Sequence, residues 1–144
     1  MITAPLTVMV TGVGAPPGVS VMKALRQSQL TPRIVGVAAD PDAVGLFRSD
    51  ATAVLPHAGR DPSCYLDALC RTIEAERATL VCFGSEIEMM VVAPQRAAIE
   101  ARTGAHLVVN DAALLARCMD KLETVELLRG IGVPVPATAD GSDA

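Results

Sequence analysis

The sequence predicts an α/β fold: a Rossmann-like three-layer domain with a mostly parallel five-stranded sheet in the strand order 3-2-1-4-5. Short apolar segments rich in β-branched residues alternate with longer amphipathic segments, which is typical of a parallel sheet covered by helices on both faces. Hydrophobic residues make up 51% of the 144 residues and charged residues 19%, enough for one well-buried domain. Right-handed crossovers between the strands then lead to the predicted order.

The first half of the chain supplies three of the expected strands. Residues 6–11 are short, apolar and partly β-branched, so they are predicted as the first strand. A loop of glycine and proline at 12–18 leads into an amphipathic helix over 19–30. Residues 33–40 and 51–56 repeat the strand pattern and complete this half of the sheet.

The second half continues the alternation and closes the sheet. Asp61 followed by proline is typical of a helix start, Pro94 interrupts the next helical pattern, and Gly104 ends it. The predicted segments, in order, are a helix over 61–78, a strand over 79–84, a helix over 85–104, a strand over 106–110 and one or two helices over 111–132.

Composition excludes several classes of partner and site. The net charge is −4, from 12 basic and 16 acidic residues, and aromatic residues are only 2%, so neither an electrostatic nor a stacking surface for nucleic acid is expected. No apolar run is long enough to span a membrane, and no signal peptide is expected, which favours a cytoplasmic protein. No metal site is expected, and reduced thiols are predicted for Cys64, Cys70, Cys82 and Cys118.

The loop after the first strand is the first candidate site. Gly12, Gly14 and Gly18 would let the backbone approach a phosphate or carboxylate at the start of the next helix, although a tight turn without a ligand has the same pattern. Pro17 departs from the dinucleotide-binding fingerprint. Asp40 ends the second strand, where a ribose-binding acid would lie, or it belongs to a turn with capping carboxylates.

Two further stretches combine charge with a helix start. Ser85 and Glu86 follow the fourth strand, and because Glu86 and Glu88 lie two residues apart on a helix, only one could enter the crevice to meet an amine or hydroxyl. Capping of the helix explains these acids equally well.

Lys121 could hold a phosphate as a point charge. If Asp120 caps the last helix, Lys121 is instead an ordinary surface residue, and the residues alone favour this second interpretation. The histidines, His57 and His106, are predicted as loop residues.

Taken together, these stretches resemble the N-terminal, pre-ATP-grasp domain of ATP-grasp ligases, most of all the carbamoyl-phosphate-synthase-like members. The resemblance covers about residues 5–138 and rests on four stretches: TGVGAPPGVSVMKAL, GVAADPDAVGLFRSDATAVLP, the Gly-Ser-Glu-x-Glu turn and CMDKLETVELLRGIGVPVPAT. It implies a pre-ATP-grasp domain over 1–136 and a linker over 137–144 toward an ATP-grasp domain. It also implies a complete enzyme that uses ATP and Mg²⁺ to activate a carboxylate for attack by an amine.

The resemblance also implies roles for single residues. Lys121 matches the basic residue that reaches the ATP phosphates. The acceptor-substrate side would be lined by Gly12, Gly14, Gly18, Ser85 and Glu86, with Asp40 as a further polar contact.

The ATP-grasp lid and the magnesium-binding acids of the family have no counterpart before Ala144. We therefore expect no ligation and no tightly bound cofactor from these 144 residues alone, and a face that meets ATP-grasp domains in the same chain or in a partner. That face could also form a homodimer. Two other hypotheses stay open: a stand-alone dinucleotide-binding module, and a non-catalytic subunit that docks on an ATP-grasp partner.

Overall fold

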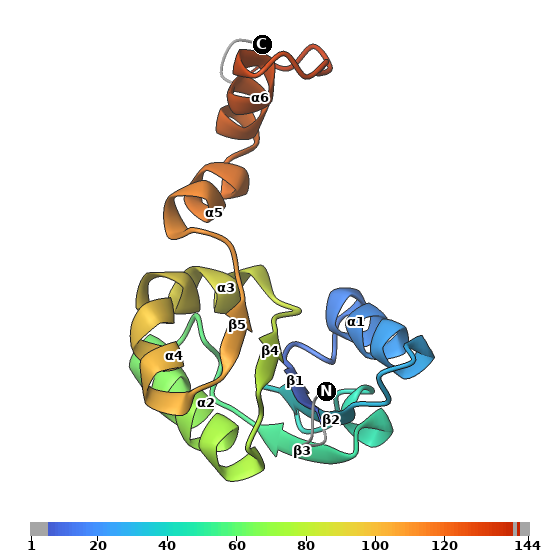
Figure 1. Ribbon diagram of the computed structural model, residues 1–144. Helices are drawn as coiled ribbons and strands as arrows, with labels where there is room; N and C mark the ends of the chain where they lie inside the picture. The colour runs from blue at the N-terminus through green and yellow to red at the C-terminus, as the bar shows by residue number, and fades with distance from the viewer. Residues whose placement is uncertain (1–5, 140, 142–144) are drawn as a thin grey trace. The chain divides into compact units, whose positions relative to one another are not determined.

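A parallel sheet organises the first of two compact units in this chain (Figure 1). The computed structural model describes residues 6–139 and 141, with the first unit ending at Val109 and the second beginning at Asn110. All four strand pairs are parallel and the order is β3-β2-β1-β4-β5, which confirms the predicted fold class and strand order. The strands are β1 (Thr7–Val10), β2 (Arg33–Ala38), β3 (Ala51–Val54), β4 (Leu80–Cys82) and β5 (His106–Val108).

Helices cover both faces of this sheet. Figure 1 shows α1 on one side of the strands and α2 with α4 on the other, as right-handed crossovers require. The interruption predicted near Pro94 is present as a short 3₁₀ turn between α3 and α4. The helical elements of this unit are α1 (Pro16–Gln27), η1 (Leu46–Arg48), α2 (Pro62–Glu76), α3 (Glu86–Val92), η2 (Ala93–Gln95) and α4 (Arg96–Thr103).

Local chemistry explains where the helices begin and end. The Asp61 carboxylate accepts a hydrogen bond from the Cys64 N–H at 3.0 Å and so caps the start of α2. Arg77 ends α2 in the left-handed conformation with φ 51°, and Gly104 ends α4 with φ 71°. α1 begins three residues before the predicted start, because Pro16 and Pro17 occupy its first positions, where proline is well tolerated.

The core lies on both faces of β1 and β2. On the α1 side, Val8 and Val10 pack with Met22 of α1 and Ile34 of β2 in one buried cluster. Helix α2 contributes the buried side chains Tyr65, Leu69, Cys70 and Ile73. The strands are shorter than predicted, but their buried residues match the apolar runs that predict them.

The second unit consists of two short helices, α5 (Ala112–Met119) and α6 (Lys121–Gly130). Asp111 and Asp120 cap them, each accepting hydrogen bonds from two backbone N–H groups, and no residue of either helix is buried. The predicted domain boundary at residue 136 and the linker over 137–144 stay predictions, and residues 140 and 142–144 of that linker lie outside the described residues. Within residues 6–139 and 141, no helix has both the length and the apolarity to cross a bilayer.

Candidate functional site

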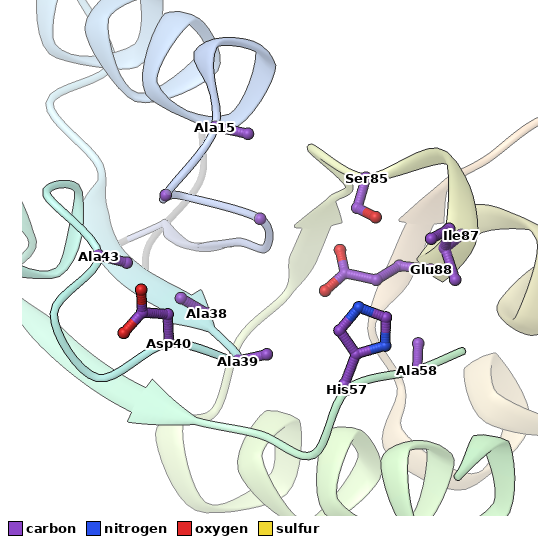
Figure 2. A pocket seen from close by; sticks show the side chains of 12 residues that line it. Ala15, Ala38, Ala39, Asp40, Ala43, His57, Ala58, Ser85, Ile87 and Glu88 are labelled. Carbon is purple, nitrogen blue, oxygen red and sulfur yellow. The ribbon is translucent and has the colours of Figure 1, made fainter. Parts of the chain in front are cut away.

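A cleft of about 320 Å³ opens at the carboxyl ends of the strands, where the loops after β1, β2, β3 and β4 meet (Figure 2). β1 lies between β2 and β4 in the sheet, so the cleft sits at the topological switch point at which parallel sheets of this type bind ligands. Its lining residues are Gly12, Gly14, Ala15, Ala38, Ala39, Asp40, Ala43, His57, Ala58, Ser85, Ile87 and Glu88.

The cleft brings together most of the site residues predicted from the sequence. Gly12, Gly14, Asp40 and Ser85 all line it. Two others do not line it: Gly18 is buried at the start of α1, and Glu86 is exposed on α3. Lys121 lies in the second unit, and the part it plays in phosphate binding stays a prediction.

The glycines of this region let two loops pack backbone against backbone. A Cβ on Gly18 would lie 2.5 Å from the carbonyl oxygen of Gly12, and a Cβ on Gly84 would lie 2.7 Å from the Gly18 nitrogen. Gly12 has φ +62° and would bring its Cβ to 2.8 Å from the carbonyl carbon of Gly84. The glycines therefore bring the loops after β1 and β4 into direct contact beside the cleft.

The start of α1 offers few free N–H groups to an anion. Pro16 and Pro17 occupy its first two positions and have no N–H to donate. The N–H of Ala15 is already bonded to the carbonyl oxygen of Gly12 at 3.1 Å. This geometry weighs against the dinucleotide-binding hypothesis, which needs donors at this helix start for the pyrophosphate.

Glu88 is the acid of α3 that enters the cleft, two residues after the predicted Glu86. Only 8% of Glu88 is exposed, and its Oε2 accepts a hydrogen bond of 2.5 Å from the hydroxyl of Thr11 at the end of β1. Burial raises the pKa of the Glu88 carboxyl, and the hydrogen bond from Thr11 opposes this shift. Glu88 is therefore a buried acid held at the edge of an open cleft.

Tyr65 of α2 completes a buried polar group with Thr11 and Glu88. Burial raises the pKa of its hydroxyl, and the negative charge of Glu88 raises it further. The hydroxyl is fully enclosed and makes no hydrogen bond to another described residue. Tyr65 therefore remains protonated and packs beside the Glu88 carboxylate.

His57 and Asp40 form more exposed parts of the cleft wall. The Nδ1 atom of His57 accepts a hydrogen bond from the Gly59 N–H at 3.1 Å, so Nε2 holds the proton of the neutral ring. Figure 2 shows the His57 ring and the Glu88 carboxylate on one side of the cleft and Asp40 on the other. Sequence reasoning missed His57 as a cleft residue, although its place just after the third strand could have indicated it.

The charged lining of the cleft is acidic. Asp40 and Glu88 line it together with His57, and among the described residues no lysine or arginine does. The described residues also contain no group of three or more histidine, cysteine, aspartate or glutamate side chains placed to hold a metal ion. The cleft therefore offers hydrogen-bond acceptors and negative charge.

Lys121 is the first residue of α6, and its neighbour Asp120 is the cap. The Asp120 carboxylate accepts hydrogen bonds from the N–H groups of Leu122 at 2.8 Å and Glu123 at 3.1 Å. Of the two interpretations of this stretch, the capping of the last helix by Asp120 is thus present. The Lys121 side chain is exposed.

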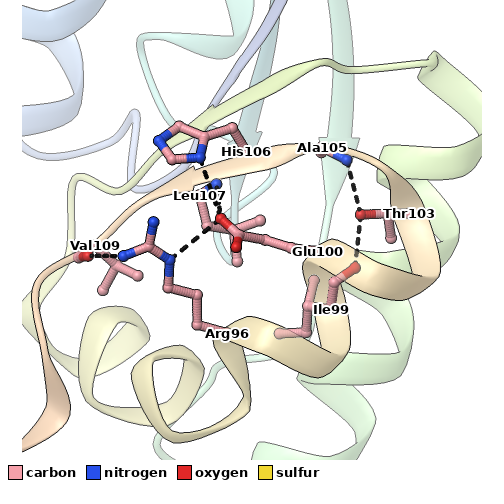
Figure 3. Close-up of polar contacts among 8 residues, drawn as sticks. All are labelled: Arg96, Ile99, Glu100, Thr103, Ala105, His106, Leu107 and Val109. Atoms are coloured by element: carbon pink, nitrogen blue, oxygen red, sulfur yellow. Dashed lines mark hydrogen bonds and ion pairs between the residues drawn. The ribbon is translucent and has the colours of Figure 1, made fainter.

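A second polar cluster, at the junction of α4 and β5, is structural (Figure 3). Glu100 Oε1 accepts hydrogen bonds from the Leu107 N–H at 2.9 Å and from Arg96 at 3.2 Å, and lies 3.3 Å from His106 Nδ1. The Leu107 N–H and then the Arg96 guanidinium lower the pKa of Glu100. Arg96 also donates to the carbonyl oxygen of Val109 at 3.1 Å, so the cluster ties α4 to the edge strand.

Solved structures show where else this fold occurs. No protein-family model and no curated protein sequence matches the chain. An L-amino acid ligase from Bacillus licheniformis aligns with 94% of this chain at TM-score 0.62 and 17% identity. The biotin carboxylase domain of a single-chain bacterial carboxylase aligns with 96% at TM-score 0.54 and 28% identity, and pyruvate carboxylase from Rhizobium etli with 97% at 0.60 and 18%.

These alignments cover nearly all of this chain but 32%, 31% and 14% of the three larger chains, so it spans about a third of their length or less. The similar structures are ATP-grasp ligases and carboxylases, which confirms the predicted resemblance. The chain has the fold of one part of an ATP-grasp enzyme.

Proposed function

We propose that this chain is the N-terminal, substrate-side domain of an ATP-dependent carboxylate–amine ligase of the carbamoyl-phosphate-synthase-like kind. The supporting observation is the likeness in fold between almost the whole chain and a small part of each larger ATP-grasp enzyme. The ATP-grasp domains would come from the same polypeptide or from a partner chain. A carboxylate or an amine is then the small-molecule substrate.

The cleft is the proposed acceptor-substrate site of this domain. Gly12, Gly14 and Ser85 line it, and these residues sit where parallel sheets bind their ligands. Glu88, and not Glu86, would supply the acid after β4, since Glu88 is the one that lines the cleft. Asp40 remains a proposed polar contact on the opposite wall.

Lys121 is the proposed contact to the ATP phosphates in the complete enzyme. Its exposed ammonium group at the start of α6 fits a phosphate, which lysine holds as a point charge. ATP would supply the phosphoryl group that activates the substrate carboxylate. No Mg²⁺ ligand is proposed among the described residues, which contain no suitable cluster.

The test of this function is Lys121→Ala in the longest polypeptide that the gene encodes. We expect the KM for ATP to rise about tenfold or more, the factor for losing one charge-assisted contact, while circular dichroism stays unchanged. ADP release with amines and carboxylates as substrates is the assay. Lys23→Ala removes the other lysine of these 144 residues, which is exposed on α1, and is the matched control. Unchanged kcat and KM for ATP in Lys121→Ala would refute the role of Lys121.

A further inference from the structure

We infer that a pocket between α1 and η1, separate from the cleft, binds a small organic phosphate, with the guanidinium groups of Arg26 and Arg48 as its contacts. This inference goes beyond the proposed function and does not depend on it. The pocket measures about 220 Å³ and shares no lining residue with the cleft. Its lining residues are Val19, Met22, Lys23, Arg26, Gly45 and Arg48.

The first argument is the sign of the charge around this pocket. All three ionisable side chains that line it are basic, in a chain whose net charge is −4. Arg26 has an acidic partner, Asp50, at 2.8 Å. Lys23 and Arg48 have no carboxylate oxygen within 4.0 Å in the part of the chain that the structure describes. Three positive charges and one negative charge leave a local surplus of two positive charges, which an anion would neutralise.

The second argument is that Arg26 is held in place. Its Nη2 atom lies 2.8 Å from Asp50 Oδ1 and donates to the carbonyl oxygen of Arg48 at 3.3 Å, so this α1 side chain is tied to the end of η1. Asp50 in turn accepts a hydrogen bond from the Ile34 N–H at 2.7 Å. The Nε and Nη1 groups of Arg26, and the whole guanidinium of Arg48, donate to no described residue. The pocket is therefore lined by two guanidinium groups with free donors, whose planar geometry suits the oxygens of a phosphate.

The third argument concerns the apolar lining and the size of the pocket. Val19 and Met22 of α1 line it beside the basic residues, and Met22 is buried. A short carbon chain on the phosphate would contact these two side chains and leave water. Drug-sized ligands occupy pockets of roughly 300–1,000 Å³, so a volume of about 220 Å³ fits a smaller molecule. A phosphate monoester carries about two negative charges at neutral pH, which matches the local surplus of positive charge.

The experiment follows methionine methyl groups by NMR in the 144-residue chain, at constant pH and ionic strength. Met22 lines the pocket, whereas Met119 lies in the second unit and is the internal reference. The ring of His57 reports on the cleft. The probes are n-propyl phosphate, inorganic phosphate and n-propylammonium, which has the opposite charge. We expect a saturable shift of Met22 with propyl phosphate, severalfold weaker binding of inorganic phosphate, no binding of propylammonium, and no shift of Met119 or His57.

Variants that remove one positive charge identify the contacts. Arg48→Gln and Arg26→Gln should each weaken propyl phosphate binding about tenfold or more, the factor for one charge-assisted hydrogen bond. Arg71→Gln is the matched control and should bind as the wild type does, because Arg71 is exposed on α2 and does not line the pocket. Arg26→Gln also removes the ion pair with Asp50. If that variant does not fold, Arg48→Gln still tests the inference, because the Arg48 side chain is exposed and donates to no described residue.

Four results would overturn the inference. The first is no saturable shift of Met22 with propyl phosphate, and the second is an equal response of Met22 to propylammonium. The third is equal weakening of binding by Arg48→Gln and Arg71→Gln, which would show that net charge and not the pocket sets the affinity. The fourth is a shift of His57 in place of Met22, which would put the phosphate in the cleft.

Discussion

Burial of Glu88 links the stability of the fold to pH. Because burial raises its pKa, the folded chain binds this proton more tightly than the unfolded chain does, between the ordinary glutamate pKa of about 4.3 and the raised value. The stability that this group contributes is therefore complete below the ordinary pKa and is lost as pH rises through the raised one. We measure the free energy of unfolding in urea from about pH 4 to about pH 8. As pH rises over this range, Glu88→Gln should become more stable relative to wild type.

The control for this prediction is Glu86→Gln, whose curve should run parallel to that of wild type. Two other carboxyls act in the opposite direction, because hydrogen bonds lower their pKa: Asp50, bonded to Arg26 and the Ile34 N–H, and Glu100. Their stabilising contribution is present at neutral pH and is lost as pH falls through the lowered values. The difference between Glu88→Gln and wild type isolates Glu88, and a constant difference across pH would contradict the prediction.

At the scale of single residues, the sequence could predict which residue types lie near the cleft but not where their side chains point. Two glutamates two residues apart must diverge on a helix, as expected, but which one enters the cleft depends on where α3 begins relative to β4. The same limit applies to α2, where Tyr65 is buried and its neighbour Leu66 only partly so. Which residues at the margin of an apolar helix face become buried depends on how the helix packs against the sheet.

The start of α2 depends on one side chain, and this gives a prediction at the scale of the element. Asp61→Ala removes the carboxylate that accepts from the Cys64 N–H, and leaves an orphan donor at the helix start. We expect a loss of about 1 kcal/mol in the free energy of unfolding, measured as a lower urea midpoint with an unchanged slope.

Asp42→Ala is the matched control, since Asp42 is exposed and its carboxylate accepts no hydrogen bond from the residues that the structure describes. Equal losses in Asp61→Ala and Asp42→Ala would show that charge, and not capping, sets the effect of Asp61→Ala.

The presence and order of the secondary-structure elements were the most predictable features of this fold. Every predicted strand is present, and the order follows because helices must cross over with one hand between parallel strands. Strand ends were not predictable, since β5 ends at Val108 although the apolar run continues to Val109. The predicted start of α1 at residue 19 is three residues too late. Pro16 and Pro17 were assigned to the loop, although proline also suits the first turn of a helix.

For the whole molecule, the structure forms one compact unit up to Val109 and another from Asn110. The domain boundary at residue 136, which the resemblance implies, stays a prediction. All the buried hydrophobic residues of the described chain lie between Val8 and Val109, and neither α5 nor α6 contains a buried residue. The core that stabilises the sheet is therefore complete before the second unit begins. Sequence patterning could not show this, because α5 has an amphipathic pattern like that of a core helix.

A chain that ends at Val109 should thus fold by itself. It keeps all five strands, and it keeps the carbonyl oxygen of Val109, which accepts the hydrogen bond from Arg96. We expect cooperative urea unfolding, with a free energy within about 1 kcal/mol of that of a chain of residues 1–136, which ends at the predicted boundary and is the matched control. In native-state hydrogen exchange of the longer chain, the amides of α5 and α6 should exchange far faster than those of β1 and β2, since few buried contacts protect them. If the chain of residues 1–109 is unfolded while that of residues 1–136 is stable, α5 and α6 belong to the folding unit, and the boundary predicted from the resemblance is the physical one.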